Sequence, residues 1–264
     1  MPRDAQSRLV NEGAVKEAGV TLTSSCASGL ARRIMGGWGV SMHIGLIGGI
    51  GPAATDFYYR RLISTFASKK AALELTIVHA DTPTLLGNLA TNNASAQVVI
   101  YTRLTNRLFA AGAECVVVTS IAGHFCIDAF KAVSTLPVVD MISEVSRAVE
   151  KRGLKRIGIL GTRTAMETRF YGGVASAEII PPSGQDLDDV HQAYIAMAAS
   201  GVATEAQRLV FNTVSRKLLE ENDAEAIMLG GTDLALVFSQ QDTAFPLVDC
   251  AAIHVDAIVR LAIS

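Results

Sequence analysis

The feature that most constrains this chain of 264 residues is an internal repeat. Three landmarks recur in the same order: an apolar strand with a central glycine, an Ala-Glu pair before a second apolar strand, and a short Pro-led strand that ends in aspartate. The paired positions are Gly45 and Gly158, Glu114 and Glu225, and Pro137 and Pro246, at offsets of 113, 111 and 109 residues. A nearly constant offset over three landmarks indicates a duplicated half.

Strands and helices alternate within each half. In the first half we expect strands at residues 43–47, 75–79, 115–118 and 136–140, with helices at 56–68 and 94–111. The pattern begins again at Lys155. Alternation of this kind predicts an α/β fold with two pseudo-symmetric lobes, each a short parallel sheet flanked by helices. The active-site cleft is expected between the lobes, at the C-terminal strand ends.

The predicted domain boundaries follow from the repeat. The first lobe is expected to span residues 42–150 and the second 151–264, with a C-terminal helix that packs back on the first lobe. Residues 1–41 differ in composition from the rest and have no continuous apolar region of the signal-peptide kind. We interpret them as a disordered extension, or as the result of an upstream start codon chosen in error.

The composition excludes several classes of protein. The chain is 50% hydrophobic, but no apolar run approaches the ~18 residues of a membrane span. A net charge of −2 predicts no nucleic-acid partner and no membrane surface. The cysteines are scattered and the histidines have no ligand spacing, so neither a metal site nor a disulfide framework is expected. We therefore expect reduced cysteines and a cytoplasmic location. The cysteines are Cys26, Cys115, Cys126 and Cys250.

A glycine-rich loop at residues 48–54 follows the first strand and allows two interpretations. It fits a relaxed dinucleotide fingerprint, which would make the protein an NAD-dependent dehydrogenase. It also fits a strand-to-helix loop whose amides bind a smaller anion such as a carboxylate. We favour the carboxylate, because Pro52 removes an N–H that a pyrophosphate would need. Asp81, in a loop at 81–84, is expected to be a turn or cap residue rather than a ribose ligand. No cofactor is predicted.

Two strand ends carry the polar groups of the predicted cleft. The first strand leads into Thr119, Ser120 and His124, and the second into Thr232 and Asp233. A cleft with two similar walls suits inversion of a stereocentre, in which one group removes the α-proton and another returns a proton to the opposite face. Ser120 and Gly231 stand at the two walls.

The chain resembles the aspartate/glutamate racemase superfamily, the cofactor-independent amino-acid racemases, over residues 42–264. The resemblance implies the two-lobed fold, a small carboxylate or amino acid as substrate, and a homodimer. The matching segments are Gly48 to Pro52 with Thr55, Thr119 to His124, Gly161 to Arg163 with Met166, Glu167, Phe170 and Tyr171, Leu229 to Asp233, and Asp249 with His254.

The resemblance also implies where the chemistry lies. The family's two catalytic cysteines stand in a Cys-Asn-Thr-x-His segment and a Gly-Cys-Thr-Glu segment. Ser120 and Gly231 take those two places here, Ile121 and Ala122 replace the Asn and Thr, and Asp233 replaces the Glu. Glycine cannot transfer a proton, and a serine hydroxyl is a poor base unless another group activates it. A two-thiol racemisation is therefore not predicted.

The predicted site consists of the groups that remain at the strand ends. His124 either activates Ser120 or is a structural histidine bonded to backbone, and Asp233 is either catalytic or a helix N-cap. Cys115 and Cys126 are expected to be core residues. The predicted catalytic residues are Ser120, His124, Thr232 and Asp233. The predicted substrate-binding residues are Gly49, Ile50, Gly51, Thr119, Ile121, Ala122, Thr162 and Gly231.

Three functions fit this sequence. The first is an isomerase of the aspartate/glutamate racemase kind that abstracts an α-proton from a small carboxylate. The second is a lyase or decarboxylase of a small carboxylic acid on the same scaffold, because a one-sided proton transfer needs only one acid or base. The third is a non-catalytic binding protein. Ile121 and Ala122 make the predicted pocket less polar, which favours an acid with an apolar side chain.

Overall fold

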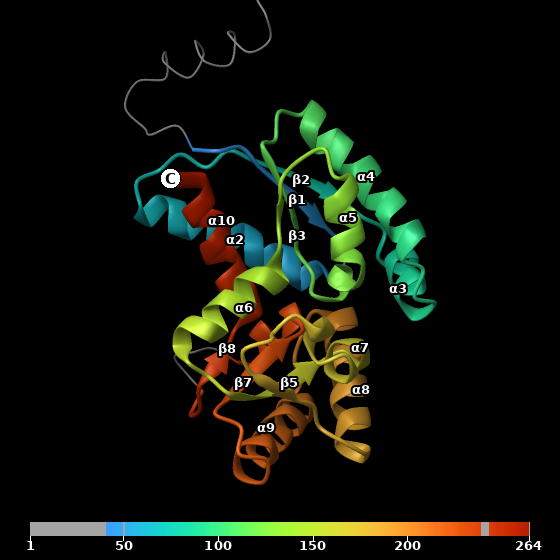
Figure 1. Cartoon of the computed structure of the whole chain (residues 1–264), viewed down its shortest axis with the longest axis vertical. Coiled ribbons are helices and arrows are strands. Elements are labelled where there is room, and N and C mark those ends of the chain that lie inside the picture. Colours follow the sequence, from blue (N-terminus) through green and yellow to red (C-terminus); the bar gives the residue numbers. More distant parts are fainter. Residues whose placement is uncertain (1–40, 50, 239–242, 264) are drawn as a thin grey trace, which may run out of the picture. The chain divides into compact units, whose positions relative to one another are not determined.

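Each half of the chain forms one four-stranded parallel sheet, and the two sheets share one strand order (Figure 1). The first sheet runs β2-β1-β3-β4 and the second β6-β5-β7-β8, with every strand pair parallel. The computed structural model describes residues 41–49, 51–238 and 243–263. Two equivalent α/β halves are thus confirmed, with the duplication visible in the topology.

The first half contains the strands and helices up to residue 152. The 3₁₀ helix η1 follows β3 directly. The elements are β1 (Ile44–Gly48), α2 (Pro52–Ser68), β2 (Leu75–His79), α3 (Thr82–Ala90), α4 (Ala94–Ala110), β3 (Cys115–Val118), η1 (Ala122–Cys126), α5 (Ile127–Val133), β4 (Val138–Val139) and α6 (Met141–Arg152).

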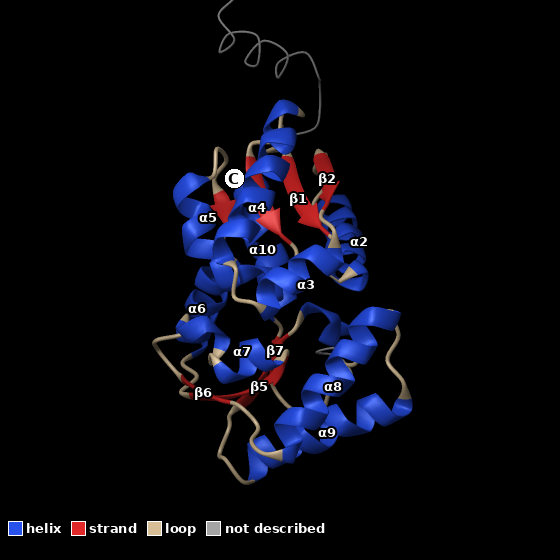
Figure 2. Cartoon of the chain, turned by 90° about the vertical axis from the view of Figure 1, so that its right-hand side faces the viewer, coloured by secondary structure: helices blue, strands red, loops and turns tan. Residues whose placement is uncertain are grey.

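The second half repeats this plan and ends in a long apolar helix. Figure 2 shows α8 and α9 side by side. The elements are β5 (Arg156–Gly161), α7 (Arg163–Glu167), η2 (Phe170–Gly172), β6 (Glu178–Ile180), α8 (Gln185–Ser200), α9 (Glu205–Glu220), β7 (Ala226–Gly230), η3 (Thr232–Leu236), β8 (Leu247–Val248) and α10 (Cys250–Ile263).

The central strands of the first sheet, β1 and β3, are buried on both faces, and their side chains divide into two cores. On β3, Cys115 and Val117 belong to one core, while Val116 and Val118 belong to the other. This is the two-residue period of a strand, with helices packed on both sides. The core that holds Cys115 and Val117 continues into the second half, whereas the other is confined to the first.

The paired glycines of the repeat have the same structural role in both sheets. A Cβ at Gly45 would lie 2.9 Å from Leu108 Cδ1 on α4, and a Cβ at Gly158 would lie 3.0 Å from Leu218 on α9. In each half the absence of a side chain lets a helix approach the central strand closely. The two halves therefore share a glycine at the position where a helix packs closely against the central strand.

Two helices begin differently from the prediction. Helix α2 begins at Pro52 rather than residue 56, because proline at the first helical turn needs no N–H partner. The predicted loop at 81–84 is the start of α3. Asp81 caps that helix by accepting a hydrogen bond from the Thr84 amide at 2.9 Å, so its interpretation as a cap is confirmed.

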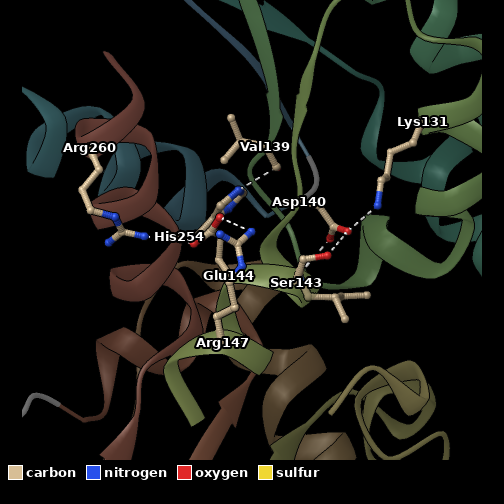
Figure 3. A network of polar contacts seen from close by, with 9 residues as sticks. Lys131, Val139, Asp140, Ser143, Glu144, Arg147, His254 and Arg260 are labelled. Carbon is tan, nitrogen blue, oxygen red and sulfur yellow. Dashed lines mark hydrogen bonds and ion pairs between the residues drawn. The ribbon is translucent and has the colours of Figure 1, made fainter. Parts of the chain in front are cut away.

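The last helix is bound to the first half by a buried histidine. His254 of α10 donates from Nε2 to the Val139 carbonyl of β4 at 2.9 Å, as Figure 3 shows. Because a carbonyl can only accept, Nδ1 is the unprotonated nitrogen, and it accepts from the Tyr58 hydroxyl of α2 at 2.8 Å. Burial, followed by the charge of His124, lowers the pKa of His254 to about 3, so the ring is neutral.

Ion pairs surround this contact (Figure 3). Glu144 of α6 accepts from Arg260 of α10 at 2.9 Å and pairs with Arg147 at 2.7 Å. Asp140 caps α6 through the Ile142 amide, and its carboxylate also pairs with Lys131 Nζ at 2.8 Å. The N-terminal turn of α6 is therefore tied both to α10 and to α5.

Among the helices that the structure describes, none is long and apolar enough to cross a membrane. The predicted extension lies outside the described residues, except for Ser41.

Tyr58→Phe tests the buried contact to His254. Without the hydroxyl, Nδ1 is left as a buried acceptor with no donor, which should lower the free energy of unfolding by about 1–3 kcal/mol. The neighbouring Tyr59 is 45% exposed and supplies the control. Tyr59→Phe should change the free energy of unfolding by less than about 0.5 kcal/mol. Urea unfolding of both variants measures the difference, and equal losses would contradict a special role for the Tyr58 hydroxyl.

Candidate active site

A cavity of about 740 Å³ is lined by residues that follow four parallel strands, β1, β3, β5 and β7. Its polar wall groups come from both halves. In order along the chain they include Gly51, Ser120, Thr162 and Asp233. The ends of parallel strands meet at one edge of a sheet, so two sheets that present this edge to a common space form the site predicted for the fold.

Two helices contribute apolar side chains to the cavity lining. Helix α3 contributes Leu86 and Leu89, and helix α8 contributes Ile195 and Ala198. Leu86 and Ile195 are each 48% exposed although they are large hydrophobic side chains. Figure 2 shows these two helices near each other. The walls therefore favour a ligand with an apolar portion.

Asp233 is the buried carboxyl group of this cavity. It is only 3% exposed, and its Oδ2 accepts a hydrogen bond from the Tyr194 hydroxyl at 2.9 Å. Oδ1 has no hydrogen-bond partner among the described residues. Burial raises the pKa of Asp233, against the opposing effect of the Tyr194 hydrogen bond and the nearby amides of Asp233 and Ala54. A carboxyl with a raised pKa is a stronger base in its charged form than an ordinary aspartate.

The carboxyl of Asp233 lies against the start of α2 in the other half. A Cβ at Gly51 would stand 3.0 Å from Oδ2 and 3.1 Å from Oδ1. Gly51 is the N-cap residue of α2, with φ of 81° and no side-chain cap. In its own segment Asp233 is not the cap, because Gly231 takes that position for η3. The N-cap interpretation of Asp233 is therefore wrong for its own helix.

Tyr194 occupies the space beside Gly231. A Cβ at residue 231 would lie 2.2 Å from Tyr194 Cε2 and 2.7 Å from its hydroxyl oxygen. Gly231 itself has ordinary extended dihedrals, φ −149° and ψ 127°, that any residue can adopt. The constraint at residue 231 is therefore the tyrosine ring and not the backbone.

Ser120 and His124 do not form a nucleophile–base pair. His124 Nδ1 donates to the Ser120 backbone carbonyl at 2.6 Å, and its Nε2 is buried without a partner among the described residues. Burial lowers the pKa of His124. This geometry matches the alternative of a structural histidine. Ser120, 4% exposed, still lines the cavity with Ala122.

Other predicted site residues make structural contacts. Thr119 donates to the Ile47 carbonyl at 3.2 Å and contacts Thr55 Oγ1, which accepts from the Gly49 amide at 3.2 Å. Thr162 Oγ1 caps α7 by accepting from Ala165, and the residue also lines the cavity. A substrate role for these residues stays a prediction.

The remaining predicted residues lie elsewhere. Ile121 is buried in the core that spans both halves. Thr232 lines a second cavity, of about 720 Å³, together with Arg60 and Arg61 of α2. Asp233 lines both cavities. Ile50 lies outside the described residues.

The thiols that the structure describes are buried and protonated. Burial raises the pKa of Cys115 to about 11 and that of Cys126 to about 12, and it raises the pKa of Cys250 well above its usual range. A thiolate is the reactive form of cysteine, so these side chains are core residues. Cys26 lies outside the described residues. Within the described ranges no group of three or more His, Cys, Asp or Glu side chains could hold a metal ion.

Sequence reasoning missed most of the cavity lining, including Arg163, His191 and Tyr194. Arg163 pairs with Glu167 and Asp188, so its charge is compensated. His191 Nδ1 accepts from the Arg163 amide at 3.1 Å, and burial, with the Arg163 charge, lowers the His191 pKa. The apolar spacing of α8 could have placed Tyr194 on a buried helix face. Its proximity to residue 231 depends on the packing of α8 against η3.

Gly231→Ala tests the crowding by Tyr194. The added methyl group must displace a buried ring, so the free energy of unfolding should fall by about 1–3 kcal/mol. Gly87, in the interior of α3, has open space around it, and Gly87→Ala should be neutral or stabilise by up to about 1 kcal/mol. A double-mutant cycle with Tyr194→Ala, followed by thermal and urea unfolding, measures the coupling. If Gly231→Ala costs the same in both backgrounds, the ring is not the constraint.

Comparison with known proteins gives one consistent family. The family model for Asp/Glu/hydantoin racemases matches residues 47–258. The crystal structure of a candidate Asp/Glu racemase from Yersinia pestis is 26% identical, with a TM-score of 0.74 over 84% of this chain and 100% of that chain. An aspartate racemase homologue from Pyrococcus horikoshii OT3 is 24% identical, with a TM-score of 0.70 over 84% and 99%.

A third solved structure widens the range of chemistry on this fold. Allantoin racemase from Klebsiella pneumoniae is 20% identical, with a TM-score of 0.55 over 85% of this chain and 91% of that chain. At identities below 25% the likeness shows the fold alone. The family match, in contrast, extends over most of the chain and includes every strand end that lines the cavity. The chain belongs to the Asp/Glu/hydantoin racemase family.

Proposed function

We propose that this protein is an isomerase that removes and returns the α-proton of a small carboxylate with an apolar side chain, either an amino acid or a related acid. Asp233 is the proposed base. The observation that carries the proposal is its buried carboxyl, which lines the cavity and keeps Oδ1 free of described hydrogen-bond partners. Family membership supports the reaction class.

The proposed step moves one proton. The Cα–H bond breaks, its electron pair is delocalised into the adjacent carboxyl group, and the proton passes to Oδ1 of Asp233. Ser120, at the end of β3, lines the same cavity from the other half. A proton returned from the Ser120 side inverts the centre, whereas a proton returned by Asp233 restores it.

The cavity supports an apolar substrate side chain. Pro83, Leu86 and Leu89 line one part of it, and Ile195 lines another. Arg163 is the cationic side chain on its wall, and it already pairs with two carboxylates. A second negative charge on the substrate would find little compensation here, so aspartate and glutamate are the less favoured substrates.

Two further expectations are also proposals. A homodimer follows from the resemblance to the racemases, and a cytoplasmic location from reduced cysteines. Size-exclusion chromatography with light scattering should give about twice the 27.9 kDa chain mass.

Proton NMR in D₂O tests the reaction. The protein is incubated with both enantiomers of alanine, leucine, phenylalanine and aspartate, and the α-proton signal is followed with chiral analysis of the product. We expect exchange with inversion, faster for the apolar acids. The rate should rise with pH through the pKa of Asp233, which burial places above that of an ordinary carboxyl.

Asp233→Asn should reduce exchange by about 10²–10⁴-fold, because the amide cannot accept the proton. Asp128→Asn is the control, since Asp128 is 93% exposed at its side chain on α5. Exchange without inversion would indicate a one-sided base and favour a lyase or decarboxylase. The absence of exchange with every acid, in a folded protein, would contradict the isomerase proposal.

A further inference from the structure

The second wall of the cavity contains a tyrosine where a side chain on residue 231 would otherwise stand. The ring and hydroxyl of Tyr194 lie 2.2–2.7 Å from the place of a Cβ on Gly231. Such distances exclude any side chain at residue 231 while the ring is present. Gly231 and Tyr194 are therefore one packing unit: the glycine makes the room and the tyrosine uses it.

The rest of α8 holds the ring in this position. Val190 and Met197 lie one turn before and one turn after Tyr194 on the same helix face, and both are fully buried. Tyr194 is itself only 6% exposed, and α8 packs against η3. The ring therefore has little freedom, and its hydroxyl is directed at a fixed point on η3.

That fixed point is one oxygen of the Asp233 carboxyl. The Tyr194 hydroxyl donates to Oδ2 at 2.9 Å, while Oδ1 is buried and takes no hydrogen bond from the described residues. On the opposite side, Gly51 offers no side chain, so the start of α2 approaches both oxygens closely. The two oxygens are thus distinguished: the phenol hydrogen-bonds to Oδ2, whereas Oδ1 has no side-chain donor among the described residues, although the amides of Asp233 and Ala54 act on the carboxyl.

We infer that Tyr194 is a positioning residue for Asp233, which holds Oδ2 through its hydroxyl, fills the space of the side chain absent from Gly231, and leaves Oδ1 as the basic oxygen. The inference rests on the proposed function for the role of Asp233 as the base. It extends that function by assigning the chemistry of the second wall to a Tyr194–Asp233 pair. The resemblance to the racemases places a thiol at residue 231, and here the pair stands beside that position.

The charged and titratable groups around the pair are few. Arg163 and His191 line the same cavity, and Asp56, Arg60 and Arg61 line the second cavity that Asp233 also borders. Of these groups, Arg163 pairs with Glu167 and Asp188, and Arg60 pairs with Asp56. Tyr194 is the side chain that hydrogen-bonds to Asp233 directly. Removing its hydroxyl therefore changes the carboxyl more specifically than any other substitution.

Tyr194→Phe is the test, because it keeps the ring beside Gly231 and removes only the hydroxyl. A donor to a carboxylate stabilises the charged form, so its loss should raise the pKa of Asp233 by about one pH unit. The carboxyl ¹³C signals are titrated in the substrate-free protein, with Asp233→Asn used to assign the resonance. The acid limb of the pH profile of α-proton exchange should move to higher pH by the same amount. At pH values below the pKa of Asp233, the exchange rate should be about tenfold lower than in the wild-type protein.

Tyr58→Phe is the matched control, since it also removes a buried tyrosine hydroxyl but one bonded to His254. It should leave both the Asp233 titration and the exchange profile in place. An unchanged Asp233 titration in Tyr194→Phe would overturn the inference, even if the exchange rate falls. A shifted titration supports the inference. If the titration shifts but the wild-type protein catalyses no α-proton exchange, the proposed function fails, while the positioning of Asp233 by Tyr194 stands.

Discussion

The buried hydrogen bonds of His254 join the last helix to the first half of the chain. His254 of α10 hydrogen-bonds to both Tyr58 and the Val139 carbonyl. Tyr58 and Val139 belong to the buried core that spans the two sheets, and His254 is itself fully buried. A neutral buried imidazole with both nitrogens satisfied is stable in such a core, whereas a charged or unpaired one is costly. Helix α10 can therefore pack against the first half with a buried polar contact that fixes its position relative to α2 and β4.

The same arrangement brings the polar strand ends together. Helix α10 follows the second sheet directly and packs on α2 and α6 of the first half (Figure 1). Helix α2 in turn contacts η3, which carries Asp233. The carboxyl of Asp233 then reaches the start of α2, where a helix N-terminus favours a negative charge. Burial raises the pKa of this carboxyl, while the Tyr194 hydroxyl and the amides of Asp233 and Ala54 oppose that rise.

The second wall illustrates how chemistry can move to a neighbouring residue within a fixed fold. The proposed reaction needs a proton-accepting group near the end of β7. Gly231 cannot supply one, but the space that it leaves is filled by Tyr194, and the carboxyl of Asp233 lies within reach of that hydroxyl. In this interpretation the family reaction continues with an oxygen base in place of a thiol, and the apolar side chains of the cavity lining select a different acid.

The sequence by itself determined the duplication, the α/β class and the strands of the first half, because glycine spacing and apolar periodicity are local properties. It also placed Ser120, Thr162 and Asp233 at strand ends, where the cavity is found. It did not predict helix α3, whose start it assigned to a loop. Only the tertiary structure decided which groups meet. The His124 ring bonds to a backbone carbonyl instead of the Ser120 hydroxyl, and Tyr194 of α8 reaches Gly231 and Asp233. These contacts depend on how helices pack against strand ends far away in the chain, and no local pattern encodes that geometry.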